Sequence, residues 1–539
     1  MYRLLIGIFL VFSINATAFA DVENTLAHEL NVLAHAKLSQ MPEQIDVLAS
    51  IDDPRIADIL QALLDGNLYT RKTDKKIFFA LAGPDRTLNL SDPLEVSDAV
   101  SKPSKEYKRI GVNNRMRSQL RTAVSQLRLQ STDEKQRLAA VLRLLNDLDP
   151  SVLGLLNQLA ETETNKTILE AVYVARALLA LEHGDRLEKL AAIDLLSGNL
   201  QPVVLNKLLL IVAADANGQR LEADPVIYKR AETAIAKIEG KADFYGFIET
   251  TFFGLSLGSV LLLSAVGLAI TFGVMGVINM AHGELIMLGA YTTYVVQLLM
   301  PDHIEYSLLV AVPTAFVVSG LVGVAIERGI IRFLYGRPLE TLLATFGVSL
   351  VLQQAVRSIF SPLNRSVATP EWMSGSWQIN PLFSLTYNRM YILVFAIIVF
   401  VLLLLLLKKT TLGLQFRAVA QNRAMARAMG IRSQWVDAMT FGLGSGVAGI
   451  AGVALSQLTN VGPNLGQAYI IDSFMVVVFG GVGNLWGTLV SAFSLGIANK
   501  FIEPVAGAVL AKILVLVFII LFIQRNPRGL FPQQGRAVD

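Results

Sequence analysis

Long apolar runs dominate the sequence from Phe244 to Ile523, and they restrict the possible folds more than any other feature. A run of about twenty apolar residues is long enough to cross a bilayer as a helix. The runs predict spans at residues 246–275, 281–300, 307–330, 339–360, 389–407, 435–457, 469–499 and 507–523, with a possible break inside the seventh. We therefore expect a polytopic α-helical membrane domain over residues 243–525, followed by a tail at 526–539.

The composition agrees with a membrane protein and excludes several other classes. The 539 residues are 53% hydrophobic, with a mean hydropathy of +0.51. The net charge is only +3, and no basic stretch is interleaved with aromatic residues, so no nucleic-acid partner is expected. The sequence has no Cys, and its five His show no zinc-site spacing. Neither a metal site nor a cofactor is predicted.

Residues 1–20 have the pattern of a secretory signal. Arg3 supplies positive charge, residues 4–14 form an apolar core too short to span a bilayer, and Ala20 ends an A-x-A cleavage site. The mature chain would then begin at Asp21, on the outer side of a bacterial inner membrane. A retained membrane anchor is the alternative.

Residues 21–242 are predicted to form a periplasmic domain of short helices, because apolar residues recur three and four positions apart. Similar helix lengths and tight turns suggest an α-solenoid of the HEAT type. The exception is residues 68–81, which predict a hairpin turning near Thr73, followed by an irregular stretch to about Lys108. The expected fold class is all-α, an exported helical domain joined to a polytopic membrane domain.

Residues 276–291, GVINMAHGELIMLGAY, place polar groups between two apolar runs. At that depth an ionisable side chain costs roughly 3 kcal/mol or more, so Asn279, His282 and Glu284 are expected to face a protein interior or a water-filled path. Glycines break the same stretch, which is typical of a substrate pathway in a transporter. Alternatively, Asn279 caps a helix starting near Ala281, and Glu284 complements its dipole. A second polar, glycine-broken place is predicted at Asp472 and Asn484.

The loop at residues 408–433 carries six basic residues and no acidic one, so the positive-inside bias places it in the cytoplasm. A short helix with a soft apolar face and a basic back is expected there, suited to a groove in a partner protein. An amphipathic helix held on anionic lipid is the alternative. The docking face would consist of Ala418, Met425 and Met429, with Gln421 and Asn422 between them and Gly430 at the helix end.

The two ends of the chain disagree about the number of spans. An exported N-terminus and eight full crossings would place the C-terminus outside, whereas Arg525 and Arg528 favour the cytoplasm. One predicted span is therefore expected to be re-entrant or misassigned, either 281–300 or 469–499.

Two of these stretches resemble a known family. GLQFRAVAQNRAMARAMGI (413–431) is similar to the cytoplasmic coupling segment of ABC-transporter permeases of the branched-chain amino acid permease family, and residues 276–291 resemble the first hairpin of that family. The likeness covers the whole membrane half. The permease subunits of bacterial urea transporters look closer still, through LETLLATFGVSLVLQQAVR, MTFGLGSGVAGIAGVALSQ, NVGPNLGQAYIIDSFMVVVFGGVG and KILVLVFIILFIQRNPRGLF.

The resemblance implies a permease subunit of an ABC importer, driven by separate ATPase subunits. The sequence has no GxxxxGK[ST] phosphate loop, so partners would hydrolyse the ATP. A second permease subunit, a periplasmic substrate-binding protein and membrane lipid are the other partners implied. The positions that match the coupling segment are Arg417, Ala418, Gln421, Asn422, Met425, Met429 and Gly430.

The solute implied by the closer likeness is urea, with branched-chain amino acids or short-chain amides as the alternative. Urea is neutral and both donates and accepts hydrogen bonds, so amide and hydroxyl groups suit it better than charges. His282 and Glu284 are then expected to be structural or gating residues. The candidate urea ligands are Asn279, Ser256, Ser259 and Thr271.

Two other functions were weighed. An intramembrane enzyme is disfavoured because Ser445 is out of register for G-x-S-x-G and no HExxH motif occurs. A membrane-anchored scaffold, in which residues 21–242 bind another protein, is compatible with transport.

Overall fold

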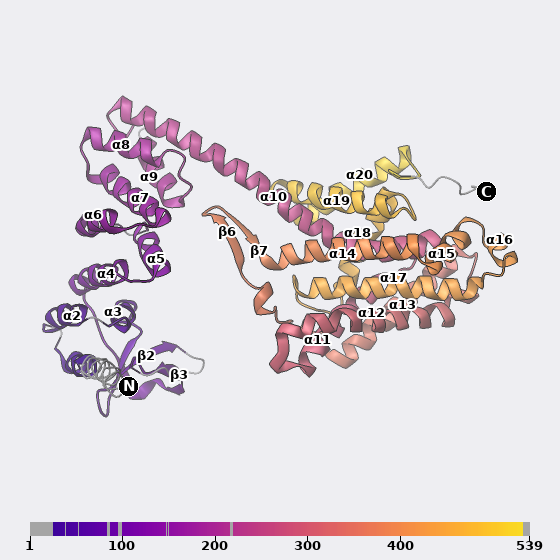
Figure 1. Cartoon of the computed structure of the whole chain (residues 1–539), viewed down its shortest axis with the longest axis horizontal. Coiled ribbons are helices and arrows are strands. Elements are labelled where there is room, and N and C mark those ends of the chain that lie inside the picture. The colour runs from indigo at the N-terminus through magenta and orange to yellow at the C-terminus, as the bar shows by residue number, and fades with distance from the viewer. Residues whose placement is uncertain are drawn as a thin grey trace, which may run out of the picture. The chain divides into compact units, whose positions relative to one another are not determined.

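The computed structural model describes residues 25–531, apart from 38, 52, 83–86, 95–99, 147, 149 and 216–218. Two compact units make up the chain, and we call them the N-terminal unit (Met1–Lys241) and the membrane unit (Ala242–Asp539) (Figure 1). The predicted signal segment lies outside the described residues.

Helices make up most of the N-terminal unit, as the apolar spacing predicts. A first core includes Leu60 and Leu120, and a second, among the later helices, includes Leu178 and Ile193. After a helical stretch at 25–35, the helices are α2 (Met41–Ala49), α3 (Arg55–Asp65), α4 (Asn114–Leu129), α5 (Glu134–Leu144), α6 (Leu153–Thr162), α7 (Lys166–His183), α8 (Arg186–Leu196) and α9 (Pro202–Val212).

A five-stranded antiparallel sheet lies between α3 and α4, so the all-α prediction is wrong for this unit. The predicted hairpin is present, with Leu68 paired to Phe79 and Thr70 to Ile77. The stretch predicted to be irregular contains three further strands, one of which is exposed along its whole length and so carries no alternation in burial. In the order β4-β3-β2-β1-β5, the strands are β1 (Leu68–Arg71), β2 (Ile77–Ala82), β3 (Thr87–Ser91), β4 (Val100–Pro103) and β5 (Tyr107–Arg109).

Side chains at helix starts explain where several of these helices begin. Asn113, Asp133 and Asn165 cap α4, α5 and α7 by accepting a hydrogen bond from a backbone N–H two or three residues further on. Asp185 and Glu188 form a capping box at α8. Each such cap stabilises its helix by about 1 kcal/mol. The HEAT-type repeat stays a prediction, since α7 has 18 residues and its neighbours α6 and α8 have 10 and 11.

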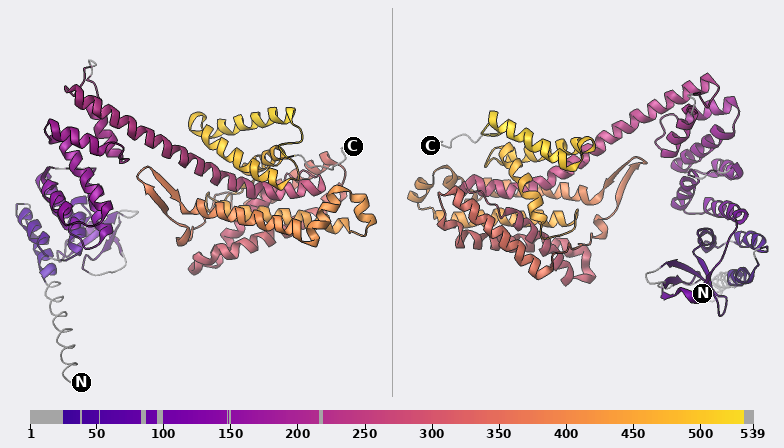
Figure 2. Two further views of the ribbon diagram at one scale, coloured as in Figure 1. Left: turned by 45° about the horizontal axis from the view of Figure 1, so that its top comes forward. Right: turned by 180° about the vertical axis from the view of Figure 1, so that it is seen from behind.

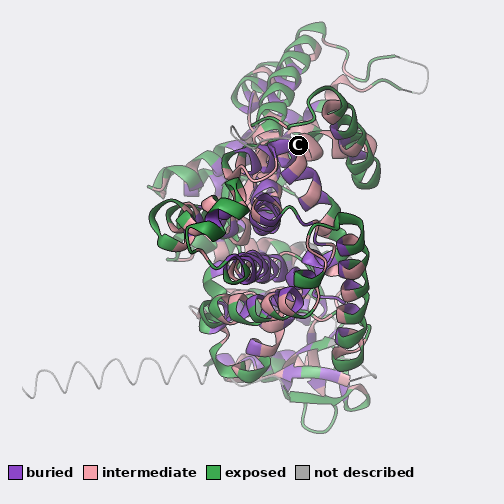
Figure 3. Cartoon of the chain, turned by 90° about the vertical axis from the view of Figure 1, so that its right-hand side faces the viewer, coloured by how far each residue is buried: buried purple, intermediate pink, exposed green. Residues whose placement is uncertain are grey.

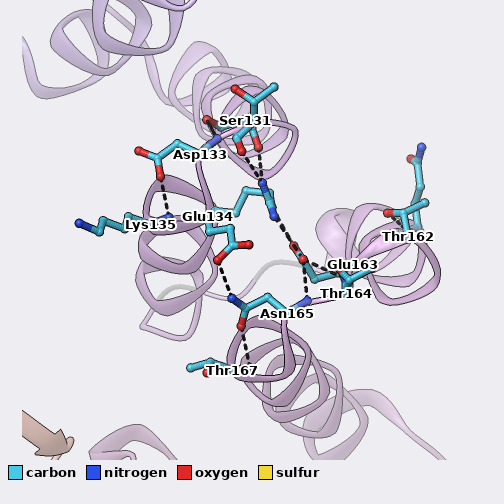
Figure 4. A network of polar contacts seen from close by, with 12 residues as sticks. Ser131, Asp133, Glu134, Lys135, Thr162, Glu163, Thr164, Asn165 and Thr167 are labelled. Carbon is cyan, nitrogen blue, oxygen red and sulfur yellow. Dashed lines mark hydrogen bonds and ion pairs between the residues drawn. The ribbon is translucent and has the colours of Figure 1, made fainter.

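Glu163 joins three consecutive helices in a network of polar contacts (Figure 4). Its carboxylate accepts hydrogen bonds from the Arg137 guanidinium at 2.7 and 3.2 Å, and from the backbone N–H groups of Thr164 and Asn165 at 2.9 and 3.0 Å. The Asn165 amide in turn donates to Glu134 at 2.7 Å. The Arg137 contact, aided by the backbone donors, lowers the pKa of Glu163 from 4.5 to about 2.

Helix α10 (Pro225–Met275) has 51 residues, of which 225–241 belong to the N-terminal unit. There only one side is buried, at residues such as Ile227 and Ala231. In the membrane unit, nearly all residues from Val260 to Ile270 are buried. The buried part of the helix surface thus widens from a stripe in 225–241 to the whole circumference in 260–270.

The membrane unit is a helical bundle with one small hairpin. Besides the second part of α10, its elements are α11 (His282–Leu299), α12 (Ile304–Gly329), α13 (Pro338–Phe360), β6 (Ser376–Asn380), β7 (Phe383–Thr386), α14 (Tyr387–Lys409), α15 (Thr411–Gln421), α16 (Arg423–Ala428), α17 (Ser433–Ser456), α18 (Leu465–Gly480), α19 (Leu485–Ala506) and α20 (Ala508–Arg525). The β6–β7 hairpin and the α15–α16 pair lie at opposite ends of this bundle (Figures 1 and 2).

Seven helices among the described residues are long and apolar enough to cross a membrane: α10, α12, α13, α14, α17, α19 and α20. The predicted span 281–300 is α11, which is not one of the seven, since its 18 residues include a His, a Glu and a Gln. The break predicted as possible inside the span 469–499 is present. The chain breaks at residues 481–484 between the 16-residue α18 and α19.

Helix α17 is the buried centre of the membrane unit, and Figure 3 shows such helices enclosed by others with exposed outer faces. Its glycines allow the neighbouring backbones to approach. A Cβ on Gly449 would lie 2.5 Å from the carbonyl oxygen of Ala315 in α12, and a Cβ on Gly289 in α11 would collide with the Gly449 backbone. The glycines of α17 therefore allow close packing of helix backbones.

Candidate functional site

The predicted polar stretch lies where the chain leaves α10 and begins α11. After Met275 the helix stops, Gly276 has a φ of +68°, and residues 276–281 are not helical. The side chain of Asn279 accepts a hydrogen bond from the N–H of Ala281 at 3.0 Å, directly before the helix starts. Asn279 therefore orders the entry into α11, close to its predicted capping role.

His282 connects the first turn of α11 to the middle of α10. Its Nε2 lies 2.8 Å from the carbonyl oxygen of Ser264, so this nitrogen carries the proton and donates it. Ser264 precedes the end of α10 by eleven residues, which corresponds to about 16 Å along the helix. Helix α11 therefore begins inside the bundle and not at its end. His282 is fully buried, as a structural role requires.

Glu284 is held by two residues of α13. Its Oε1 accepts hydrogen bonds from the Ser349 hydroxyl at 3.0 Å and from the Gln353 amide at 2.6 Å, and its side chain is almost fully buried. Its Oε2 has no hydrogen-bond partner among the described residues. One carboxylate oxygen is thus occupied, while the other is buried without a hydrogen-bond partner in the described part of the chain.

The partners of Glu284 belong to a polar stripe on α13 that our sequence reasoning missed. The stripe consists of Thr341, Thr345, Ser349 and Gln353, all buried and four residues apart. The Thr345 hydroxyl accepts a hydrogen bond from the N–H of Met280 at 3.1 Å. Polar residues at a four-residue spacing in an apolar helix were a usable signal, because that spacing puts them on one face.

Helix α18 also begins inside the bundle, against the first turn of α11. A Cβ on Gly283 would lie 2.5 Å from the carbonyl oxygen of Gly466, and a Cβ on Gly466 would lie 2.9 Å from the backbone nitrogen of Glu284. The first turns of two helices therefore meet beside Glu284. Each carries the positive end of its dipole there, but the N–H groups of Ala281, Glu284 and Leu465 already donate to other groups of the chain, each at 3.0 Å. The break that matches residues 276–281 is thus the start of α18, which we did not predict.

The other predicted pathway residues lie elsewhere. Ser259 and Thr271 on α10 donate to carbonyl oxygens of their own helix, at 2.7 and 3.1 Å, and Ser256 is fully buried on the same helix. Asp472 pairs with Lys512 of α20 at 2.9 Å. Asn484 caps α19 and donates to the carbonyl oxygen of Phe531 at 3.2 Å. The contacts within the structure bring only Asn279, His282 and Glu284 together.

The predicted coupling segment is two helices and not one. Asn422 is extended, with φ −150° and ψ 101°, and it caps α16 by accepting a hydrogen bond from the N–H of Met425 at 2.9 Å. The predicted single face is therefore wrong. Ala418 on α15 is half-buried, whereas Met425 and Met429 are 61% and 77% exposed.

The remaining coupling residues surround this exposed tip. Gly430, with a φ of +87°, ends the helical turn as predicted. The guanidinium of Arg417 donates to the carbonyl oxygen of Leu407 and so holds α15 against the end of α14. Gln421 is exposed. Two exposed methionines beside basic residues form a surface suited to a protein groove.

A multi-pass bundle with two helices that begin in its interior, and an exposed apolar tip at one end, defines a membrane transport subunit. Residues 250–523 match the family model "Branched-chain amino acid transport system / permease component". The chain belongs to this permease family.

Characterised relatives match the same half of the chain. The high-affinity branched-chain amino acid transport system permease protein BraD of Pseudomonas aeruginosa is 29% identical over 298 residues, which is 53% of this chain and 96% of the relative. LivH of Escherichia coli K12, which carries the same description, is 30% identical over 297 residues, again 53% and 96%. The ribose import permease protein RbsC of E. coli K12 is 28% identical over 271 residues, 45% and 74%. These relatives are transporter components and not enzymes.

No solved structure is significantly similar to the chain.

Proposed function

We propose that the chain is the permease subunit of an ABC importer in a bacterial inner membrane, and that separate ATPase subunits dock on α15 and α16. The observation that carries this proposal is the exposed pair Met425 and Met429 at one end of a bundle of the permease family. A soft apolar tip of this kind suits a groove on a partner protein. Because the sequence has no phosphate loop, ATP hydrolysis falls to the partners.

We place α15 and α16 in the cytoplasm and the N-terminal unit in the periplasm. Together with α11 and α18, the seven membrane-length helices make nine passages, an odd number. The C-terminus then lies in the cytoplasm, where the positive-inside bias also puts Arg525 and Arg528. The N–H of Leu530 donates to the carbonyl oxygen of Phe479 at 2.9 Å, so the tail lies at the end of α18, beside the start of α19. Nine passages would reconcile an exported N-terminus with the terminal charges.

For the solute, we infer a branched-chain amino acid first. BraD and LivH carry that substrate in their descriptions. The polar cluster also suits a zwitterion. The positive ends of the α11 and α18 dipoles would favour a carboxylate, and the unpartnered Oε2 of Glu284 would bind an ammonium group.

Urea is the second candidate, and short-chain amides belong with it. The observation in favour is the hydroxyl and amide stripe from Thr345 to Gln353, which could both donate to and accept from a neutral solute. Two of the predicted urea ligands contribute less than expected, since the Ser259 and Thr271 hydroxyls donate within their own helix.

The remaining partners are a second permease subunit and a periplasmic binding protein. The N-terminal unit lies outside the region that matches the permease family. We propose that this unit receives the binding protein or another periplasmic partner. Deleting residues 25–224 separates two roles: loss of transport indicates a receptor or gate, and loss of partner capture with transport intact indicates recruitment.

Uptake of radiolabelled leucine and of radiolabelled urea, in cells that lack the gene and are complemented with wild type or Gly430→Trp, tests the proposal. We expect leucine uptake to disappear in the deletion and in the Trp variant, although the variant still inserts in the membrane. If urea uptake is lost in the deletion and in the Trp variant while leucine uptake is not, urea becomes the first candidate solute. If uptake of leucine, urea and acetamide is unchanged in the deletion, transport of these solutes is refuted.

Glu284→Gln separates the two solutes within one protein. Removing the charge while keeping the shape should lower leucine uptake by about tenfold or more, because a lost charge-assisted contact costs about 1.5–3 kcal/mol. Urea uptake should change much less, since a neutral solute needs no counter-charge. Glu503→Gln, whose carboxylate pairs with Lys500 on α19, is the matched control.

A further inference from the structure

Behind the exposed tip of α16 lies a cluster of polar side chains that joins three elements. Arg423 of α16 donates to both carboxylate oxygens of Asp437 in α17, each at 2.8 Å. Its guanidinium also donates to the hydroxyl of Tyr335 and stacks 4.0 Å from the centre of that ring. The Tyr335 hydroxyl donates to Asp437 at 3.2 Å. We call Arg423, Asp437 and Tyr335 the clamp.

The clamp is built as a rigid connection and not as a surface ion pair. The Asp437 side chain is only 4% exposed and that of Arg423 is 24% exposed, so the pair is shielded from water and salt. A bidentate contact fixes both the distance and the orientation of the guanidinium. Burial, and then the Asp437 carboxylate, raises the pKa of Tyr335 above 10, so its hydroxyl stays protonated. A second contact beside it, from Arg427 to Ser433 at 2.7 Å, also joins α16 to α17.

Each clamp residue lies on an element that leads into the bundle. Asp437 is in the first turns of α17, the buried helix that packs against α11 and α12. Tyr335 stands three residues before Pro338, the start of α13. Helix α13 carries Ser349 and Gln353, which hold Glu284. A continuous set of contacts therefore runs from α16 to the polar cluster.

We propose that the clamp transmits the movement of the ATPase-docking helix α16 to α17 and α13, an inference that rests on the proposed function. Arg423, Asp437 and Tyr335 are then positioning residues for coupling. The exposed methionines contact the partner, and the clamp makes α16, α17 and the start of α13 move together. Without the clamp, α16 would follow the ATPase while the bundle stays behind.

The first test measures solute uptake per ATP hydrolysed by the complete transporter in proteoliposomes. Arg423→Lys keeps the charge and loses the bidentate contact, and Tyr335→Phe removes only a hydroxyl. Residues along a coupling network change the coupling by amounts that correspond to about two- to thirty-fold. We expect each variant to lower uptake per ATP within that range while the ATPase stays bound and active. Arg432→Lys, an exposed cation in the same loop, is the control.

A second test does not depend on transport. The chain contains no Cys, so spin labels can be placed at Ala424→Cys in α16 and Gln434→Cys in α17, both exposed. The distance distribution in the full chain should be narrow in the wild-type background and clearly broader with Arg423→Lys. If the wild type transports nothing, the proposed function fails, and the label distances still report on the clamp.

Three results would overturn the inference. Uptake per ATP that stays at the wild-type value in both clamp variants would show that the contacts do not transmit movement. Loss of ATPase binding would make the clamp part of the docking surface instead. A distance distribution unchanged by Arg423→Lys would show that other contacts hold α16.

Discussion

The two units are built from the same kind of helix, with opposite placement of polar and apolar residues. In the N-terminal unit, Thr70 is the one polar residue buried as a whole among those described, although the side chains of Asp53 and Glu163 are only 5% and 2% exposed. Leucines fill the cores. The membrane unit buries many hydroxyl, amide and carboxyl groups, and it exposes large apolar side chains such as Leu339 and Val351. Burying apolar surface away from water stabilises the first unit, whereas burying it away from lipid stabilises the second unit little.

The membrane unit therefore needs a driving force for helix packing other than the hydrophobic effect. Its helices gain contact through small residues and interhelical hydrogen bonds, because side chains as apolar as lipid gain little from leaving it. Gly289 and Gly449 supply the first kind of contact, and Glu284 with Gln353 the second. A change that is harmless in one unit should therefore be damaging in the other.

The largest effect is expected from Gly449→Leu. A Cβ at this position would lie 2.5 Å from the Ala315 carbonyl oxygen and 2.6 Å from the Ser319 hydroxyl, so α12 and α17 cannot stay in contact. We expect little folded protein. Its yield is measured as the monodisperse peak in size-exclusion chromatography of a fluorescent fusion. Gly347→Leu on the outer face of α13 is the control, since a Cβ there has no described atom within 4 Å. Equal yields would refute glycine-dependent packing.

Next in size is Glu163→Gln in the N-terminal unit. The pKa of Glu163 is lowered from 4.5 to about 2, so its ionised form stabilises the fold above pH 4.5, and this contribution is lost as the pH falls from about 4.5 towards 2. The substitution should cost about 2 kcal/mol at pH 7, since solvent screening reduces the full value of the shift. Hydrogen exchange of amides in α5–α7 measures the loss, which should shrink as the pH is lowered to 3.

The exposed Glu161→Gln is the control for this prediction. A loss in Glu163→Gln that is the same at pH 7 and pH 3 would contradict the ionic origin of the effect.

A smaller effect is expected from Thr345→Val in the membrane unit. Valine has nearly the same shape, but it leaves the N–H of Met280 without its acceptor at 3.1 Å. An unpaired buried donor costs about 1–3 kcal/mol. The melting temperature of the protein in nanodiscs should fall, and Thr345→Ser, which keeps the hydroxyl, should restore most of it. If valine melts like the wild type, the stripe on α13 is not needed for stability.

The smallest effect is expected from Val351→Ala on the same helix. The side chain is 67% exposed, and lipid fills the place of the lost methyl groups, so the change in stability should stay within about 0.5 kcal/mol. Val356→Ala, at 3% exposure, is the matched partner and should cost clearly more. Equal costs would mean that a protein surface, and not lipid, covers Val351.

Much of the fold could be predicted from local patterns. The apolar runs located most spans, and the three- and four-residue spacing located the helices of the N-terminal unit. Local sequence patterns did not predict every helix start or every strand. The possible break inside 469–499 was predicted and is present at residues 481–484, but the start of α18 inside the bundle was not predicted. The exposed strand β4 has no burial pattern to find.

The candidate site was likewise predicted only in part. Asn279, His282 and Glu284 were visible because polar residues in an apolar run are costly, and their spacing put them in one short stretch. Ser349, Gln353 and Gly466 were missed because they come from distant segments that only packing brings to Glu284.

By itself, the sequence determined that the chain has a membrane half, which residues there are polar, and which loop is basic, because these follow from transfer energies of single side chains. Only the tertiary structure decided that α11 and α18 begin inside the bundle, that Glu284 is held by α13, and that Arg423 is joined to Asp437 and Tyr335. Those contacts join residues 65 or more positions apart, or 14 and 18 positions apart across a break between helices. No local pattern specifies such pairs, since their energy depends on how whole helices pack.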